Sequence, residues 1–214
     1  MADHYGKISS LRFCFYNCRG FNSFKQSYLR SLLHECEFLF LQEHWLSVSQ
    51  ISSLNSISAD HMAIGVCGFD NSDVLSGRPY GGCAIFWRKT VDAQITVVDT
   101  CSKRMCALRI RSNAANLLLI SVYMPYEDSC KNSSHTDEFV SMLSAIDYLN
   151  SQHQDCFIIV GGDLNVDFVR ESYHTSLLSK FCEEHDLHPV VSHSILAKFK
   201  HAAERIACDS GPTF

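Results

Sequence analysis

The chain is organised around the stretch Asp155-Cys-Phe-Ile-Ile-Val-Gly-Gly-Asp-Leu-Asn165. Five apolar residues lie between an acid and a glycine pair, a pattern typical of a short strand that is buried on both faces. The glycines allow a sharp turn where the chain leaves the sheet. Because Leu164 separates Asp163 from Asn165, an extended backbone places both side chains on the same side. The pattern predicts a carboxylate and a carboxamide together at a sheet edge, although such residues are also common in ordinary turns.

Three other apolar runs also end in a polar side chain. Asn17 follows the first run, Glu43 follows the second in Leu41-Gln-Glu43, and Tyr123 lies in Ser121-Val-Tyr-Met-Pro125. Each polar residue stands where a hydrophobic run stops. Together with the Asp163 turn, these strand ends indicate a site built along the edge of a layered sheet core.

Five motifs in a fixed order carry a family resemblance. They are Asn17-Cys-Arg-Gly20, Leu41-Gln-Glu-His-Trp-Leu46, Gly81-Gly-Cys-Ala-Ile85, Val122-Tyr-Met-Pro125 and Gly161-Gly-Asp-Leu-Asn165. No single motif is specific, but their order resembles the endonuclease/exonuclease/phosphatase superfamily. Within it, the chain is most similar to the apurinic-type endonuclease domain of non-LTR (LINE-type) retrotransposons. The expected organisation is an N-terminal tail, residues 1–10, followed by one such domain, residues 11–214, that is incomplete at its C-terminus.

Length and composition favour one domain with a substantial core. The chain has 214 residues, of which 46% are hydrophobic, which is enough for one well-buried interior. No apolar run reaches the roughly 20 residues that span a bilayer. The N-terminus lacks the basic and apolar regions of a signal peptide. We therefore expect an intracellular protein, with the nucleus as one compartment, that is not secreted and makes no contact with a membrane.

Cysteine usage points to the same compartment. The chain has 11 cysteines, an odd number that cannot pair completely. They are scattered, several lie inside strand-like runs, and no C-x-x-C pair of the kind found in zinc sites occurs. Reduced, buried thiols are therefore expected.

The charge balance limits how the chain can hold nucleic acid. A net charge of -5 argues against a protein that binds chiefly through a broad basic surface. It does not exclude a nuclease, because a divalent cation supplies positive charge at the scissile phosphate. Local basic pairs occur at Arg88-Lys89, Lys103-Arg104, Arg109 with Arg111, and Lys198 with Lys200. Such pairs are more often solvated edges, and only pairs that flank the site would hold phosphates.

Hydrophobic periodicity predicts strands mixed with helices. Strands are expected at 11–16, 38–41, 62–66, 82–88, 93–98, 105–111 and 117–124. The last four have no helix between them and should pair as antiparallel neighbours. Helices are expected from a capping box at Ser23, at 47–55, at 136–152 with Thr136 as the N-terminal cap, and around Leu177. Residues 68–79 are expected to form a loop, and the pattern fades from His188 onward.

This mixture indicates an α/β fold with two packed sheets and helices outside them. The resemblance implies a DNase-like four-layer α/β/β/α sandwich with its active site at one end of the sheets. It also implies two final strands, one with an Asp and one with a Ser-Asp-His run. The chain ends at Gly211-Pro-Thr-Phe214 and contains no Ser-Asp-His run, so the sandwich is expected to lack its last strands. We expect a fragment of a longer reading frame that continues into a reverse transcriptase.

The resemblance also implies the metal ligands. The Glu of the Gln-Glu motif, Glu43, would be the principal ligand, with Asn17 beside it. Mg²⁺, or Mn²⁺ as an alternative, prefers oxygen ligands and keeps several waters, so a single carboxylate can be its main protein anchor.

The chemistry of the remaining residues suggests their roles. Asp163 would accept a hydrogen bond from the attacking water, and Asn165 would donate one to a phosphate oxygen. Tyr123 would donate its hydroxyl to the phosphate, although a core aromatic with a wet tip is equally consistent with its position. Arg19 would contact a DNA phosphate, although an exposed arginine near a turn is equally ordinary.

The predicted function is metal-dependent nicking of DNA by a retrotransposon endonuclease domain. Activity is expected to be weak or absent, because a missing catalytic base removes a factor of about 10² to 10⁴. Two alternatives remain open. One is a phosphoesterase of the same fold that acts on a lipid or inositol headgroup, because fold does not fix function. The other is a non-catalytic relic that acts only as a binding domain.

Overall fold

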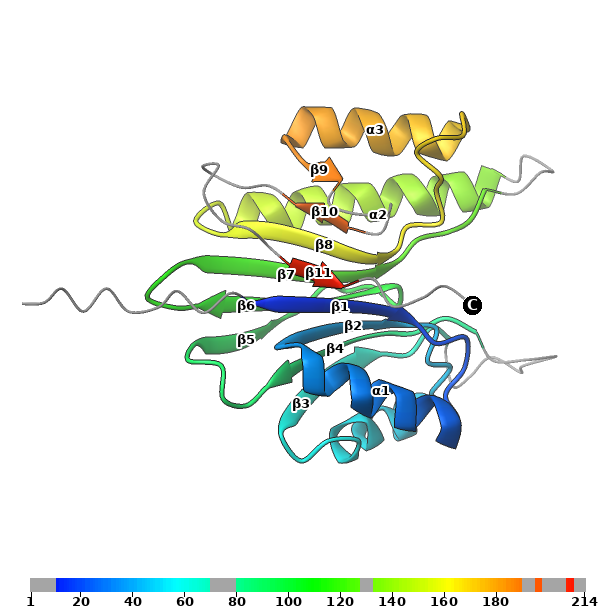
Figure 1. Ribbon diagram of the computed structural model, residues 1–214. Helices are drawn as coiled ribbons and strands as arrows, with labels where there is room; N and C mark the ends of the chain where they lie inside the picture. Colours follow the sequence, from blue (N-terminus) through cyan, green and yellow to red (C-terminus); the bar gives the residue numbers. More distant parts are fainter. Residues whose placement is uncertain (1–10, 70–79, 128–132, 190–194, 198–206, 210–214) are drawn as a thin grey trace, which may run out of the picture.

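Two β-sheets form the centre of the computed structural model, which describes residues 11–69, 80–127, 133–189, 195–197 and 207–209 (Figure 1). Sheet A has the order β11 (Ala207–Asp209), β1 (Arg12–Asn17), β2 (Phe38–Gln42), β4 (Cys83–Arg88), β3 (His61–Val66). Sheet B has the order β5 (Gln94–Val98), β6 (Met105–Arg111), β7 (Asn116–Tyr123), β8 (Phe157–Asp163), β10 (Ile195–Ala197), β9 (His188–Pro189). The N-terminal tail 1–10 lies outside the described residues.

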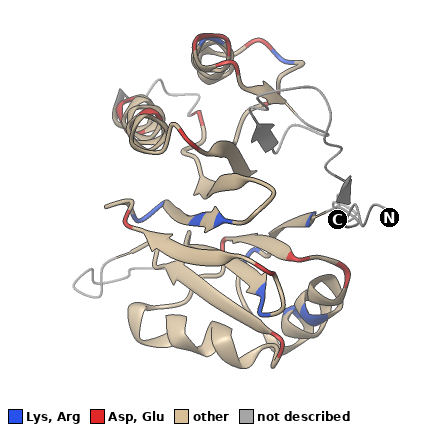
Figure 2. Cartoon of the chain, turned by 90° about the vertical axis from the view of Figure 1, so that its left-hand side faces the viewer, with Lys and Arg blue, Asp and Glu red and all other residues tan. Residues whose placement is uncertain are grey.

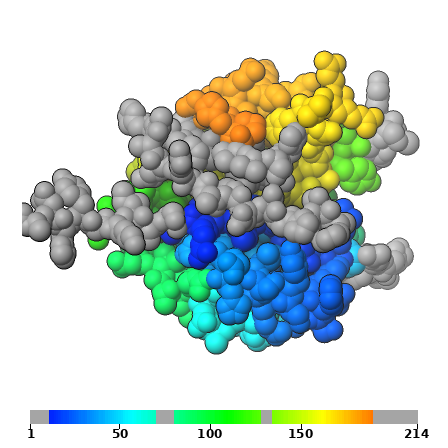
Figure 3. Space-filling view, viewed as in Figure 1, coloured from blue at the N-terminus to red at the C-terminus, as the bar shows by residue number. Residues whose placement is uncertain are grey.

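Helices cover the outer face of each sheet. Helix α1 (Ser23–Glu35) and the 3-10 helix η1 (Val48–Ser56) pack on sheet A, and helices α2 (Ser133–Gln152) and α3 (Tyr173–His185) pack on sheet B. Figure 2, which views the molecule from the end where β1 begins, shows the layers one above the other. In the space-filling view, blue surface that includes α1 lies in the lower half and orange surface that includes α3 lies at the top (Figure 3). The α/β/β/α sandwich predicted from the sequence is confirmed.

The core between the sheets explains why the central strands read as uninterrupted apolar runs. Phe38 and Phe40 of β2 point toward sheet B, whereas Leu39 and Leu41 pack under the helices of sheet A. All four side chains are fully buried. A strand that is covered on both faces has no solvent side, so it shows no polar alternation. The rings of Phe13 and Phe38 stack with centroids 5.4 Å apart, which fixes the contact between β1 and β2.

Strand direction gathers the predicted polar residues at one end. β1 and β2 are parallel, with Asn17 opposite Gln42. β7 and β8 are also parallel, with Tyr123 opposite Asp163. All four strands therefore finish at the right-hand end of the sandwich in Figure 1. We call this the site end.

The four strands expected to pair in succession do not all do so. β4 pairs with β2 on one side and with β3 on the other, both antiparallel. Both of its edges are therefore occupied, and β5 joins β6 in the other sheet. The prediction is correct for β5, β6 and β7 but wrong for β4. Residues 89–93 carry the chain from one sheet to the other.

Two predicted helix starts also shift. Asn22, not Ser23, caps α1, because its side chain accepts a hydrogen bond from the Lys25 backbone N–H. Thr136 is not a cap, because α2 begins earlier, at Ser133, and Thr136 lies inside it. The segment expected as a short helix after Ser47 is a 3-10 helix.

The last described strands are short. β10 pairs with β8 and β11 pairs with β1. Segments of two or three residues carry no readable period, which explains the absence of a signal after His188. Lys198, Lys200 and most of the loop expected at 68–79 lie outside the described residues.

Two composition-based expectations are checked by the described part of the chain. Nine cysteines of this part are free thiols, and all of these nine except Cys101 are buried, as expected for reduced thiols. Over the same residues, no helix is long and apolar enough to cross a membrane.

Candidate active site

The site end brings two distant carboxylates onto a single donor. The side-chain nitrogen Nδ2 of Asn17 donates to Glu43 Oε1 and to Asp163 Oδ2, and both distances are 2.7 Å. Asn17 ends β1 and Glu43 directly follows β2, both strands of sheet A, and Asp163 ends β8 of sheet B. One amide group therefore holds a carboxylate of each sheet and joins the two sheets at this end.

The backbone around Glu43 is held in an uncommon conformation. Glu43 has φ +54°, and Arg19 and Trp45 are also in the left-handed region. Hydrogen bonds from both sides fix this turn, since the Glu43 N–H donates to Gly82 O at 2.8 Å and Glu43 O accepts from the Gly20 N–H at 2.7 Å. Left-handed non-glycine residues cost about 1–3 kcal/mol each and cluster at functional sites. The turn lifts the Glu43 side chain out of the pleat and toward Asn17.

The loop after β8 uses Asn165 as a structural tie. The Asn165 backbone N–H donates to Asp163 Oδ1 at 3.1 Å, and its carboxamide Nδ2 donates to the carbonyl oxygen of Met124 at 2.7 Å. Asn165 also has a left-handed backbone, with φ +50°. The carboxamide nitrogen carries two hydrogens, and the Met124 carbonyl accepts one of them. The loop thus fixes both Asp163 and the end of β7.

The partly buried surroundings of the site raise the pKa of two of its groups, Asp163 and Tyr123. Burial raises the pKa of Asp163, and the nearby charge of Glu43 raises it further, against the hydrogen bonds from Asn165 and Asn17. Burial and the charges of Glu43 and Asp163 raise the pKa of Tyr123 to about 12. At neutral pH the Tyr123 hydroxyl therefore keeps its proton and acts as a donor.

Arg104 lies against Tyr123, a contact that the sequence did not single out. Arg104 O accepts from the Tyr123 backbone N–H at 2.9 Å, and the guanidinium carbon lies 5.4 Å from the centroid of the tyrosine ring. Its Nε donates to Glu138 Oε1 of α2 at 2.7 Å. The available signal was the basic pair Lys103-Arg104 in the turn between two strands.

The other described basic pairs bind elsewhere. Arg88 donates to backbone carbonyls at the end of α1, and Arg109 pairs with Asp155 at 2.6 Å. Arg19 is exposed, and its backbone N–H donates to Asn17 Oδ1 at 3.1 Å. Its backbone therefore helps to orient the Asn17 amide, while its side chain is accessible to a ligand.

Gln42 and His44 support the site from below. The buried Gln42 Nε2 donates to Ser121 Oγ at 3.1 Å and so links the two sheets directly under the carboxylates. The His44 ring is fully buried against Gly82, where an added Cβ would lie 2.4 Å from His44 Cε1. Burial lowers the pKa of His44 to about 4, so the ring is neutral and acts as packing. Gln42 precedes Glu43 directly, which was the signal for its place beneath the site.

The donor set matches a hard divalent cation. It offers carboxylate and carboxamide oxygens, which Mg²⁺ and Mn²⁺ prefer. The Cys18 thiol donates to Glu43 O at 3.4 Å, and burial raises its pKa to about 12, so it stays protonated. Among the described residues, no group of three or more His, Cys, Asp or Glu side chains is placed to hold a metal. Glu43 and Asp163 would bind an ion that retains several waters, with Asn17 setting the spacing between them.

Solved structures with the same fold include three proteins of different kinds. The endonuclease domain of TRAS1, a telomere-specific non-LTR retrotransposon, aligns with TM-score 0.59 and 14% identity over 84% of this chain and 74% of that chain. The AP endonuclease LMAP from Leishmania major aligns with TM-score 0.63 and 13% identity over 88% of this chain and 71% of that chain. A beta toxin from Staphylococcus aureus aligns with TM-score 0.63 and 14% identity over 95% of this chain and 90% of that chain. At these identities the likeness establishes the fold alone.

Sequence comparison supplies the family. No curated protein matches the chain. The model described as the Endonuclease/Exonuclease/phosphatase family matches residues 14–183. The match covers most of the chain and includes all five motifs and the residues that meet at the site end. The chain therefore belongs to the Endonuclease/Exonuclease/phosphatase family.

Proposed function

We propose that this chain hydrolyses phosphodiester bonds with the help of Mg²⁺ and nicks DNA as the endonuclease domain of a non-LTR retrotransposon. The observation that carries the proposal is the Asn17 amide, which holds the Glu43 and Asp163 carboxylates at one point. Two acids on one neutral donor keep a concentration of negative charge that a divalent cation would balance. Family membership supports phosphoester hydrolysis in general.

The residues would divide the chemistry as follows. A bound divalent cation offsets negative charge on the phosphate and on the leaving oxygen. Asp163 accepts a hydrogen bond from the attacking water, and its raised pKa makes it a better base than an ordinary aspartate. Tyr123 donates its hydroxyl, and Asn165 the amide hydrogen that Met124 does not use, to phosphate oxygens. The exposed Arg19 contacts a phosphate outside the reacting centre.

DNA is favoured as the substrate by two independent lines of support. The combination of Asn17-Cys-Arg-Gly20 with Gln42-Glu-His-Trp45 resembles the retroelement branch of the family. The endonuclease domain of TRAS1 and the AP endonuclease LMAP share the fold over most of this chain. In this role the domain would act on chromosomal DNA in the nucleus, with a reverse transcriptase as its functional partner.

The test is conversion of supercoiled plasmid to the nicked form. Wild-type protein should nick in Mg²⁺ or Mn²⁺ and stop when EDTA is added, and Glu43→Gln and Asp163→Asn should not nick. Glu37→Gln, which changes an acid at the opposite end of the sandwich, should nick like wild type. Phosphate release from inositol phosphates or phospholipids without nicking would assign a headgroup substrate instead. Absence of hydrolysis with Mg²⁺ binding that Glu43→Gln does not weaken would indicate a relic.

A further inference from the structure

Exposed aromatic side chains concentrate at the site end. Large aromatic side chains with high exposure in the described chain are Phe24, Tyr80, Tyr126, Tyr148 and Tyr173, with exposed fractions of 81%, 54%, 55%, 63% and 59%. All except Tyr148 belong to segments next to the strand ends that form the site. Phe24 lies in the first turn of α1 after β1, Tyr80 precedes β4, Tyr126 follows β7, and Tyr173 begins α3 after β8. We call Phe24, Tyr80, Tyr126 and Tyr173 the rim aromatics.

The residues that follow Tyr80 and Phe24 in the chain contact the site. Tyr80 is followed by Gly81, whose added Cβ would lie 3.9 Å from Tyr123 Cδ1. Phe24 is followed by Lys25, whose Nζ donates to Arg19 O at 2.7 Å, and Arg19 in turn donates to Asn17. Phe24 and Tyr80 therefore each lie one residue away from a residue that contacts the site.

Tyr126 and Tyr173 form a pair on the sheet B side. Glu127, next to Tyr126, accepts from the backbone N–H groups of Tyr173 and His174 at 3.3 and 3.0 Å. The Tyr126 ring meets the His135 ring edge-on with centroids 4.8 Å apart. The Glu127 carboxylate thus ties the two segments together, while more than half of each tyrosine remains exposed.

Charge at this end gives a nucleic acid little help. Without a bound cation, Glu43 and Asp163 repel phosphates, Glu127 and Asp167 are exposed, and Arg104 already pairs with Glu138, so the exposed Arg19 is the main described side chain here that attracts a phosphate. A ligand that carries phosphates therefore needs another source of affinity. Aromatic rings supply one, because every base has a face that stacks on them, which is worth about 1–3 kcal/mol per base. In an intact duplex those faces are covered, and uncovering one costs a few kcal/mol.

We propose that the rim aromatics bind unpaired bases that flank the scissile phosphodiester, so that the chain prefers single-stranded or locally melted DNA to intact duplex. This inference rests on the proposed function for its placement beside the reacting phosphate, but it concerns binding and not hydrolysis. A membrane surface fits less well, because Phe24 and Tyr126 are each followed in the chain by a charged residue, Lys25 and Glu127, and three of the four rim aromatics carry a hydroxyl group.

Binding without cleavage tests the proposal directly. Fluorescence anisotropy in EDTA is measured with a labelled single strand, the same sequence as an intact duplex, and a duplex with an unpaired bubble. The single strand and the bubble should bind at least about tenfold more tightly than the duplex, since unstacking costs a few kcal/mol. The slope of log affinity against log salt should be shallow, near that of two or three phosphate contacts, each worth about 0.7 on a single strand. Equal affinity for intact duplex overturns the proposal.

Side-chain variants distinguish ring stacking from general hydrophobic contact. Tyr126→Leu and Tyr173→Leu, which remain apolar but lose the ring, should each weaken single-strand binding by about 5- to 150-fold. Tyr126→Phe and Tyr173→Phe should bind like wild type. Tyr148→Leu is the matched control, equally exposed but on the outer face of α2, and should have no effect. Thermal melts identify any variant that is unfolded.

The remaining outcomes each decide the question. Leucine variants with wild-type affinity overturn the proposal, and so does binding to phosphatidylcholine and phosphatidylserine vesicles that the leucine variants retain, because that is a membrane surface. If the plasmid assay shows no nicking while single-strand binding follows the rim aromatics, the proposed function fails and the inference stands. If nicking occurs without any preference for unpaired bases, the reverse holds.

Discussion

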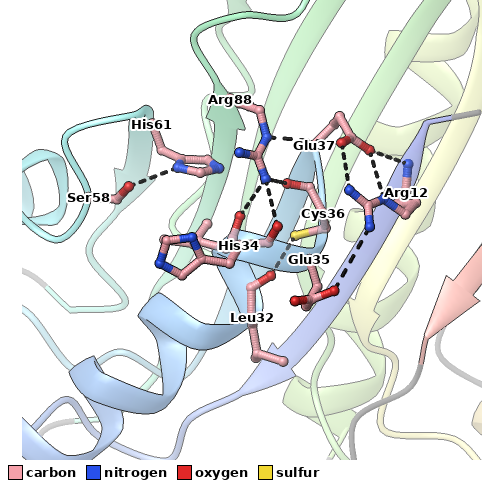
Figure 4. A network of polar contacts seen from close by, with 10 residues as sticks. Arg12, Leu32, His34, Glu35, Cys36, Glu37, Ser58, His61 and Arg88 are labelled. Atoms are coloured by element: carbon pink, nitrogen blue, oxygen red, sulfur yellow. Dashed lines mark hydrogen bonds and ion pairs between the residues drawn. The ribbon is translucent and has the colours of Figure 1, made fainter. Parts of the chain in front are cut away.

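The two ends of the sandwich treat their acidic residues in opposite ways. At the site end, Glu43 and Asp163 share one neutral amide. At the opposite end, the Glu37 carboxylate accepts from the Arg12 backbone N–H at 2.8 Å and from the Arg12 guanidinium at 3.1 Å, with Arg88 Nε at 4.0 Å (Figure 4). One end thus keeps its negative charge available, and the other neutralises it with arginines.

At the opposite end, a single side chain, Arg88, hydrogen-bonds several backbone carbonyl groups. Its Nη2 lies 2.9, 3.0 and 3.1 Å from the carbonyl oxygens of Leu33, His34 and Cys36 (Figure 4). The last carbonyls of a helix have no partner within the helix, and a cation there also complements the helix dipole. A single guanidinium therefore closes the end of α1 and connects it to β4.

The pKa values of the two acids shift in opposite directions. Burial opposes ionisation of Glu37, but the hydrogen bonds from Arg12 and the charges of Arg12 and Arg88 together outweigh it, so the pKa of Glu37 is lowered. Burial and the charge of Glu43 raise the pKa of Asp163. Ionised Glu37 therefore stabilises the fold, whereas ionised Asp163 destabilises it. Groups that oppose the stability of their own fold are typical of functional sites.

The largest expected effect comes from substitutions at the site end, which should reduce activity without reducing stability. Asp163→Asn and Glu43→Gln should each reduce plasmid nicking by about 10² to 10⁴, the range that a positioned acid or base supplies. The free energy of unfolding, measured in urea at pH 7, should stay equal or rise, because each change removes one of two like charges. Lower stability together with lost activity would contradict the assignment, since the acids would then be structural.

The next largest effect comes from a substitution at the opposite end, which should reduce stability without reducing activity. Arg88→Met should reduce the free energy of unfolding by about 2–4 kcal/mol, because it leaves several backbone carbonyls without a donor. Urea titration followed by circular dichroism measures this change. Arg111→Met, on an exposed arginine of β6, is the control and should change stability by less than about 0.5 kcal/mol. The folded Arg88→Met protein should nick at the wild-type rate, and a selective loss of nicking would link the two ends.

A smaller effect sharpens the role of Arg104. Arg104→Gln should slow nicking about 2- to 30-fold, because a cation over an aromatic ring contributes about 0.5–2 kcal/mol. The slowing should disappear in a Tyr123→Phe background if Arg104 acts through the tyrosine hydroxyl, which a double-mutant cycle measures. Arg109→Gln removes a comparable ion pair, with Asp155, away from the site and should not slow nicking. Additive effects of Arg104→Gln and Tyr123→Phe would refute the coupling.

The finest comparison is the pH dependence of stability. A lowered pKa means that Glu37 contributes stability above its ordinary pKa and loses it as the pH falls toward the lowered value. Wild type should therefore exceed Glu37→Gln at pH 7 and converge with it in acid. Asp163 has a raised pKa, so its ionisation lowers stability as the pH rises from the ordinary to the raised value. The free energy of unfolding of Asp163→Asn should therefore rise relative to that of wild type over that interval. Unfolding curves from pH 3 to 7 measure the stability difference between each variant and wild type.

Much of this contrast follows from the sequence, because strand ends are local signals. Asn17, Glu43 and Asp163 each follow an apolar run, and parallel pairing of β1 with β2 and of β7 with β8 brings the ends together. The choice of sheet is different. β4 leaves its successor β5 because β2 and β3 occupy both of its edges, and no short-range pattern encodes that competition.

Side-chain partners across the fold were equally out of reach. Arg88 looked like half of an exposed basic pair, but it is 54 residues from the His34 carbonyl that it caps. Arg104 is 34 residues from Glu138. Long side chains choose partners after the layers are packed, so spacing along the chain carries no trace of the choice.

The Asn17 bridge has a consequence for how activity and folding depend on each other. In the proposed mechanism each sheet supplies part of the reacting groups, so neither sheet would have a function without the other. A shear of the two layers by about 1 Å is enough to cost a factor of 10² in rate, long before the protein unfolds. The catalytic rate of this chain would thus report small displacements of one sheet relative to the other that a thermal unfolding curve does not detect.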